Sequence, residues 1–127
     1  MGKIRFSKEA IKAGFLVENP GVYEFELTGH RELPATTGSV NHLLTWTGRS
    51  GEMDGVPVTM LINENASWVA LPIWQAILHP KPPVEDEDYN WEDAIGVHLK
   101  ALCKRGTRYG SNATENQLSD FRPVSMG

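Results

Sequence analysis

Aromatic and basic side chains are the residues of this sequence that could act together, and the chemistry they suit is binding of single-stranded nucleic acid. Bases stack on flat aromatic rings, at about 1–3 kcal/mol each, and phosphates bind in a basic groove. Eight residues are candidates for such a surface: Trp46, Arg49, His98, Lys100, Lys104, Arg105, Arg108 and Tyr109. Arg31 is a further basic candidate.

Each candidate also has an ordinary structural interpretation. A tryptophan on a strand with apolar residues on both faces packs in a core as readily as it stacks on a base, which applies to Trp46. Lys100 and Lys104 alternate with apolar residues, as on the solvated outer face of any strand. Arg105, Arg108 and Tyr109 lie in a glycine-containing loop expected over residues 105–113, where basic and aromatic side chains favour binding over a merely polar connection.

Catalytic chemistry has little support in the sequence. The four histidines show no metal-ligand spacing with the single cysteine, Cys103. The glycines of residues 48–55 lack the Lys-Ser/Thr that completes a phosphate-binding loop. Glu24 and Glu26 share one face of a strand, an arrangement typical of a solvated edge. We therefore expect no catalytic residue, no bound metal and no cofactor.

The distribution of charge matters more than its sum. The chain has 12 basic and 16 acidic residues, a net charge of −4, but six of the acids lie within residues 85–93. The other 118 residues carry 12 basic and 10 acidic side chains, and residues 100–108 hold four bases and no acid. Three interpretations of the acidic run are open: a solubilising loop, a dock for a basic partner, or an internal competitor lying over a basic groove.

The length of 127 residues indicates one domain, residues 1–127, with an N-terminal extension at residues 1–19 and an acidic loop at residues 80–93. A single cysteine excludes an internal disulfide framework and favours a reducing compartment. We find no apolar signal core and no apolar run long enough to span a bilayer. The expected location is the cytoplasm of a host cell, away from membranes.

The elements that must position these residues are read from hydrophobic periodicity. Alternation predicts strands over residues 22–28, 39–47, 56–62, 94–104 and 115–121, whereas helical spacing predicts helices over residues 7–13 and 71–78. Pro72 suits the first position of the second helix. In the second strand either face could be buried: Val40, His42, Leu44 and Trp46, or Asn41, Leu43, Thr45 and Thr47.

The remaining aromatic residues are assigned to packing. Spacing places four of them in the core: Tyr23, Phe25, Trp74 and Phe121. Trp68 and Trp91 flank loops and suit lids over the ends of a barrel. Three strands, a helix, a long loop and two strands are the element order of the OB-fold. The expected fold class is therefore mainly β, a five-stranded OB-fold-like barrel with one helix between strands 3 and 4; the alternative is an SH3-like or other small β-barrel.

Four segments resemble the small OB-fold single-stranded-DNA-binding and binding-like proteins encoded by phages and prophages. They are Asn19-Pro20-Gly21-Val22-Tyr23-Glu24-Phe25, the turn from Gly48 to Gly55, Trp91-Glu92-Asp93-Ala94-Ile95-Gly96-Val97 and the closing stretch Asn116 to Pro123. The resemblance implies non-catalytic binding of single-stranded DNA in viral or phage replication or recombination, with a replication or recombination enzyme and further copies of the chain as partners. The acidic, Phe-terminated tail of cellular single-strand-binding proteins is absent, so recruitment by such a tail is not expected.

Two other functions fit the same barrel, because a fold does not by itself fix a function. One is a protein-interaction adaptor, or an inhibitor of a host enzyme, with the acidic loop as its contact. The other is a barrel that binds a small ligand or a saccharide in a concave pocket with aromatic walls. Convergence of the basic residues beside an exposed aromatic ring favours DNA binding, and their scatter favours the adaptor.

Overall fold

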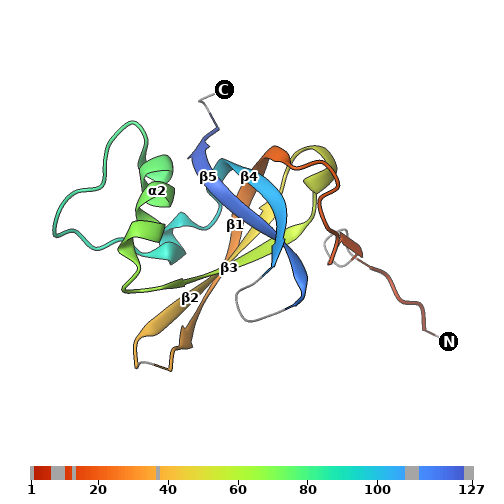
Figure 1. The fold of residues 1–127 in the computed structure, drawn as a ribbon, viewed down its shortest axis with the longest axis horizontal. Helices are drawn as coiled ribbons and strands as arrows, with labels where there is room; N and C mark the ends of the chain where they lie inside the picture. Colours follow the sequence, from red (N-terminus) through yellow and green to blue (C-terminus); the bar gives the residue numbers. More distant parts are fainter. Residues whose placement is uncertain (1, 7–10, 13, 37, 108–111, 125–127) are drawn as a thin grey trace.

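The computed structural model describes residues 2–6, 11–12, 14–36, 38–107 and 112–124. Its regular elements are five strands, one α-helix and two short 3-10 turns: β1 (Gly21–Pro34), β2 (Val40–Gly48), η1 (Gly51–Met53), β3 (Pro57–Asn63), α2 (Ser67–Leu78), η2 (Trp91–Ala94), β4 (His98–Thr107) and β5 (Thr114–Pro123). The chain is therefore mainly β, as the sequence predicts, and the helix lies between the third and fourth strands (Figure 1). Of the short helix expected over residues 7–13, residues 7–10 and 13 lie outside the described part.

All five strands belong to one antiparallel sheet in the order β3-β2-β1-β4-β5. The long strand β1 makes this order possible, because its first half pairs with β4 and its second half with β2. A register shift between Leu27 and Gly29 marks a bulge where the two halves meet, and bulges increase the twist of a strand.

The expected closed barrel is not observed. β3 and β5 are the two edges of the sheet, and the described strands form no ladder between them. The edges still face each other, because residues of both line one hollow of about 730 Å³ that includes Met60 and Leu118. The sheet is thus strongly curled but open between β3 and β5 (Figure 1).

One face of the curled sheet encloses the core. Leu44 and Trp46 of β2 are fully buried, which decides the open question of that strand: its core face is the one that carries Trp46. Of the expected core aromatics, Phe25 and Trp74 are buried, while Tyr23 and Phe121 are half-buried against the same cluster. On β4, Leu99, Ala101 and Cys103 point inward as predicted, so Lys100 and Lys104 point outward.

Helix α2 begins at Ser67, four residues earlier than expected, and Pro72 lies inside it. Helical proline is costly because it lacks an N–H and leaves one carbonyl unpaired, here that of Trp68. Both residues are exposed, so water can satisfy that carbonyl. The opposite side of the helix packs inward through Ile73 and Trp74.

The two tryptophans expected as lids behave differently. Trp91, in η2, is buried, and its ring lies 5.1 Å from that of Trp74 between centroids. Trp68 is 73% exposed on the outer side of α2 and covers nothing. Residues 91–94 form the η2 turn, so the fourth strand starts at His98 and not at residue 94.

The ends of β1 depart from expectation on both sides. Residues 30–34, which lie between the first two predicted strands (22–28 and 39–47), continue β1 because they pair with β2. Residues 15–19, expected in the N-terminal extension, pack on the body: Val17 is fully buried, and the Asn116 side chain bonds both Val17 N and the carbonyl of Phe15.

Among the described residues no helix is long and apolar enough to cross a membrane.

Candidate nucleic-acid interface

Two basic residues lie opposite each other on the outward face of the sheet. Lys100 of β4 is in register with Arg122 of β5, and it also pairs with Glu24 of β1 on its other side. Together with Val22, Tyr23 and Ser50, these residues line a hollow of about 490 Å³, which we call the cationic hollow. Three strands and the turn before η1 thus bring its walls together.

The two cations of the cationic hollow have one acidic neighbour, Glu24, whose carboxylate is bonded to His98. Within the described part of the chain, neither Lys100 nor Arg122 forms an ion pair. Like charges directly opposite on neighbouring strands destabilise a sheet. An anion bound between them would offset that repulsion, and the planar guanidinium of arginine suits a phosphate group.

Tyr23 is the aromatic residue among those that line the cationic hollow, and its side chain alternates with that of Phe25 on the inner side of β1. Its hydroxyl lies 2.8 Å from Glu52 Oε1 and 2.6 Å from the carbonyl oxygen of Asn19. Hydrogen bonding to the Glu52 carboxylate, followed by burial, raises the pKa of the Tyr23 hydroxyl above its ordinary value. The ring is therefore held in one position, half-buried against the core.

Glu52 holds the Tyr23 hydroxyl and the segment before β1 in place. Burial acts to raise the pKa of its carboxyl, but hydrogen bonds from Glu18 N, Tyr23 Oη and Asn19 N outweigh that effect and lower it. The two backbone bonds are 3.1 Å and 2.7 Å long. Glu52 thereby joins η1 to the segment that precedes β1.

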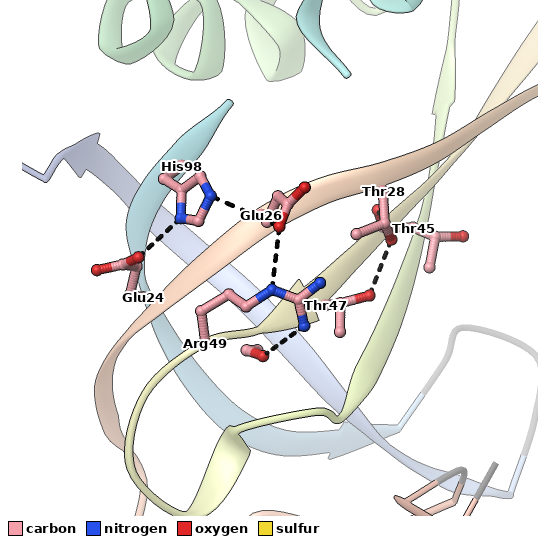
Figure 2. A network of polar contacts seen from close by, with 8 residues as sticks. Glu24, Glu26, Thr28, Thr45, Thr47, Arg49 and His98 are labelled. Carbon is pink, nitrogen blue, oxygen red and sulfur yellow. Dashed lines mark hydrogen bonds and ion pairs between the residues drawn. The ribbon is translucent and has the colours of Figure 1, made fainter. Parts of the chain in front are cut away.

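A network of acids and bases borders the cationic hollow, and it contains two of the predicted site residues (Figure 2). His98 Nδ1 lies 2.7 Å from Glu24 Oε2, and His98 Nε2 lies 3.5 Å from Glu26 Oε1. Arg49 Nε donates to the same Glu26 oxygen at 3.0 Å. Glu24 and Glu26 therefore do occupy one wet face, but they serve as partners of His98 and Arg49 and leave these two bases less free to bind phosphate.

Three threonines continue this outward face across β1 and β2. The hydroxyl oxygens of Thr28 and Thr47 are 2.8 Å apart, and Thr28 Oγ1 donates to the Thr45 carbonyl at 3.2 Å (Figure 2). The Thr28 and Thr47 side chains and the Thr45 carbonyl thus join β1 to β2 beside the Glu26–Arg49 pair.

Trp46 does not serve as the predicted platform on which a base could stack. Its side chain is fully buried, and its ring lies 5.1 Å from that of Phe121 between centroids. A ring in the core offers no face to a base, so the platform assignment is corrected to a core residue. Trp46 Nε1 is also buried without a hydrogen-bond partner among the described atoms.

The other predicted bases do not converge on one point. Lys104 is exposed on the same outward face as Lys100, four residues further along β4. Arg105, expected in a loop, lies in β4, which extends to Thr107. It points to the other side, where its Nε donates to the carbonyl of Val17 at 2.7 Å, so it holds the N-terminal segment. Arg108 and Tyr109 lie outside the described residues. Exposed Arg31 lies in the half of β1 that pairs with β2, away from the half that pairs with β4.

Sequence reasoning missed Arg122 and placed Tyr23 only in the core. Arg122 lies near the end of β5, next to a proline. It belongs to the site because it lies opposite Lys100, and the register of β4 on β5 sets that position. Tyr23 alternates with Phe25 and is therefore assigned to the core, although it is only half-buried near the start of β1.

A second polar cluster lies on the inner side of the β1–β2 hairpin. His30 Nδ1 is 2.8 Å from Glu92 Oε1, and His30 Nε2 is 2.9 Å from His42 Nδ1. The two imidazole rings are also stacked, with centroids 5.1 Å apart. The side chains of His30, His42 and Glu92 thus join η2 to the β1–β2 hairpin.

Nothing in the described part of the chain gathers three or more His, Cys, Asp or Glu residues in an arrangement that could hold a metal ion.

Cys103 lies in the core beneath the sheet. Burial, with a smaller contribution from the charge of Glu52, raises the pKa of its thiol to about 11. A thiol with so high a pKa is a poor nucleophile at neutral pH.

The chain was compared with known protein families and with curated proteins, and neither comparison finds a match.

Proposed function

We propose that this protein binds single-stranded DNA, without catalysis, on the outward face of β4 and β5. The observation that supports the proposal is the cationic hollow, in which Lys100 and Arg122 lie in register and neither forms an ion pair in the described structure. Glu24 also lines this hollow, where its carboxylate is bonded to His98. A phosphate between the two cations would offset their repulsion.

The strand connections support an OB-fold as the finer description of the fold. In the observed sheet β1 lies between β2 and β4, the helix joins β3 to β4, and β3 and β5 line a common hollow. Closing the gap between β3 and β5 would give a five-stranded Greek-key barrel, the architecture whose faces and loops commonly bind oligonucleotides.

The bound strand is expected to run along β4. One phosphate lies between Lys100 and Arg122, and a second lies near Lys104, which is about 13 Å further along an extended strand. A base can then stack on the accessible part of Tyr23, which replaces Trp46 as the aromatic candidate. Phosphate contacts give affinity without reading sequence, so the preference among bases is expected to be weak.

The test is fluorescence anisotropy of a labelled oligothymidine titrated with the protein at several salt concentrations. Wild-type affinity is expected to fall steeply as salt rises, because phosphate neutralisation releases counterions. The double variant K100A/R122A removes two phosphate contacts. It is expected to weaken binding at least tenfold and to reduce the slope of log affinity against log salt by about two.

A matched control removes one lysine and one arginine elsewhere. K81A/R31A makes the same change in net charge at exposed positions outside the cationic hollow, and its affinity is expected to stay within about twofold of wild type. Equal weakening in both double variants would show a non-specific charge effect. No saturable binding by wild type at low salt would reject the proposal.

A biological role in viral or phage replication or recombination, with an enzyme of those processes as partner, is what the family resemblance implies and forms part of the proposal. The second candidate function is the protein-interaction adaptor. It is favoured by one observation, an apolar surface around the exposed Trp68 of α2 that borders the acidic loop. Absence of DNA binding together with an intact fold would favour the adaptor.

A further inference from the structure

Two hollows adjoin each other on the side of the molecule where α2 meets the acidic loop. The first, of about 480 Å³, has mainly apolar walls that include Trp68, Leu71 and Pro83. The second, of about 720 Å³, is bordered by five acids: Glu32, Glu64, Glu87, Asp88 and Asp93. The two share Trp74 and Tyr89 as a common wall. We call the pair the α2 groove.

The α2 groove exposes apolar side chains beside acids, one of which, Glu64, accepts a hydrogen bond from Val40 N. Trp68 is 73% exposed and Leu71 46% exposed. Among the described residues that line the two hollows there is no lysine and no arginine. A contiguous apolar surface with an acidic border is typical of a site that binds a basic, apolar segment.

The chain itself contains a segment of that description. Residues 2–6, which we call the N-terminal arm, read Gly-Lys-Ile-Arg-Phe. Ile4 is 81% exposed and Phe6 is 65% exposed, and the arm belongs to none of the strands or helices of the body. In an extended conformation successive side chains point to opposite sides. Ile4 and Phe6 then share one side, and Lys3 and Arg5 share the other.

The alternation of the arm matches the composition of the groove. Ile4 and Phe6 suit the apolar hollow beside Trp68, while Lys3 and Arg5 suit the acids of the adjoining hollow. The arm lies at the opposite end of the molecule's longest dimension from α2 and the acidic loop (Figure 1). The arm of one copy is therefore placed to reach the groove of another copy.

We infer that the N-terminal arm of one copy docks in the α2 groove of a second copy, so that the protein self-associates head to tail. Such contacts are heterologous: each copy offers one arm and one groove, and the assembly grows as a ring or an open chain. The acidic loop then forms part of a self-association site. This inference does not depend on the proposed DNA binding, because no residue of the cationic hollow belongs to the arm or the groove.

The test is sedimentation velocity of the nuclease-treated, full-length protein over a wide range of concentration. Wild-type protein is expected to increase in average mass with concentration, and less so at high salt. The arm variant I4S/F6S and the groove variant W68S/L71S are each expected to raise the dissociation constant at least tenfold. The control L61S/I95S removes two exposed apolar side chains outside the groove and is expected to leave association unchanged.

Mixing the two variants distinguishes a head-to-tail contact from any other. The groove variant keeps an intact arm and the arm variant keeps an intact groove, so the mixture is expected to form 1:1 pairs and nothing larger. A charge exchange tests the same contact: K3E/R5E and E87K/D88K should each fail to associate alone and should pair when mixed.

Four results would overturn the inference. They are a wild-type protein that stays monomeric at every concentration, association lost only in the groove variant, mixtures that form no pairs, and equal loss in the L61S/I95S control. If the arm docked in the groove of its own chain, wild type would be monomeric and the arm variant would change Trp68 fluorescence at every concentration. Circular dichroism confirms that each variant is folded.

Discussion

At the scale of single residues, the candidate site depends on side chains whose partners come from distant parts of the chain. Glu52 is the clearest case, since it accepts hydrogen bonds from Glu18, Asn19 and Tyr23. Its carboxylate therefore stabilises the segment that leads into β1 and orients Tyr23 at the cationic hollow. The charged form is the one that is stabilised, so this contribution depends on pH.

Replacement of Glu52 by glutamine tests that dependence. The lowered pKa of the folded carboxyl means that its stabilising effect is present above the ordinary value of 4.5 and is lost as pH falls through the folded pKa. E52Q is expected to melt at a lower temperature than wild type near neutral pH, and the difference should shrink as the solution becomes more acidic. Thermal unfolding followed by circular dichroism across the acid range measures it.

The control for this experiment is E85Q, in the exposed acidic loop and outside the α2 groove. It makes the same chemical change away from Glu52, so its melting temperature should follow wild type at each pH. A destabilisation of E52Q that does not change with pH would show that shape, and not charge, is what Glu52 contributes.

At the scale of elements, the fold depends on close approaches at the ends of strands. Gly48 ends β2 where the chain turns into η1, and its N–H bonds the Val56 carbonyl at 2.8 Å. A Cβ atom at this position would lie 1.8 Å from the carbonyl oxygen of Met53. The backbone of η1 can pack here only because residue 48 has no side chain.

Substitution of Gly48 by alanine is therefore expected to destabilise the protein by about 1–3 kcal/mol, the usual cost of forcing an extra methyl group into a packed region. G29A is the matched control, because a Cβ at Gly29 would lie at an ordinary 3.5 Å from Thr45. Urea unfolding of both variants measures the difference. Similar free energies of unfolding for G48A and wild type would contradict this account of the turn.

At the scale of the whole molecule, the charges are divided between two surfaces. The Lys100–Arg122 pair lies on the outward face of the sheet, and the acids of the loop border the groove at α2. None of residues 80–93 lines the cationic hollow, which argues against the loop as an internal competitor for DNA. The mildly acidic total charge thus averages over two surfaces of opposite character.

This separation predicts that the two proposed activities are independent. K100A/R122A is expected to lose affinity for oligothymidine while it self-associates like wild type. I4S/F6S is expected to self-associate poorly. Its affinity for a short oligothymidine should equal that of wild type when both are measured at a protein concentration at which wild type is monomeric. Anisotropy and sedimentation on the same samples measure both. Parallel loss of the two activities in either variant would show that the surfaces are coupled.

The sequence by itself determined the class of fold and the faces of most strands. Alternation in β1 and β4 identified Phe25 and Leu99 as core residues and Lys100 as outward, because the side-chain period of a strand is fixed by its backbone. It could not decide the face of β2, where both sets contain apolar residues, and so it placed Trp46 on the surface as readily as in the core.

Tertiary structure alone decided which side chains meet. The pairing of Lys100 with Arg122 follows from the register of β4 on β5, and the assignment of Arg105 to the N-terminal segment follows from packing across 88 residues of chain. Such contacts join residues far apart in sequence, and local periodicity carries no information about register between strands. The residue types were therefore readable from the chain, whereas the cationic hollow and the α2 groove exist only once the sheet is curled and the helix is docked.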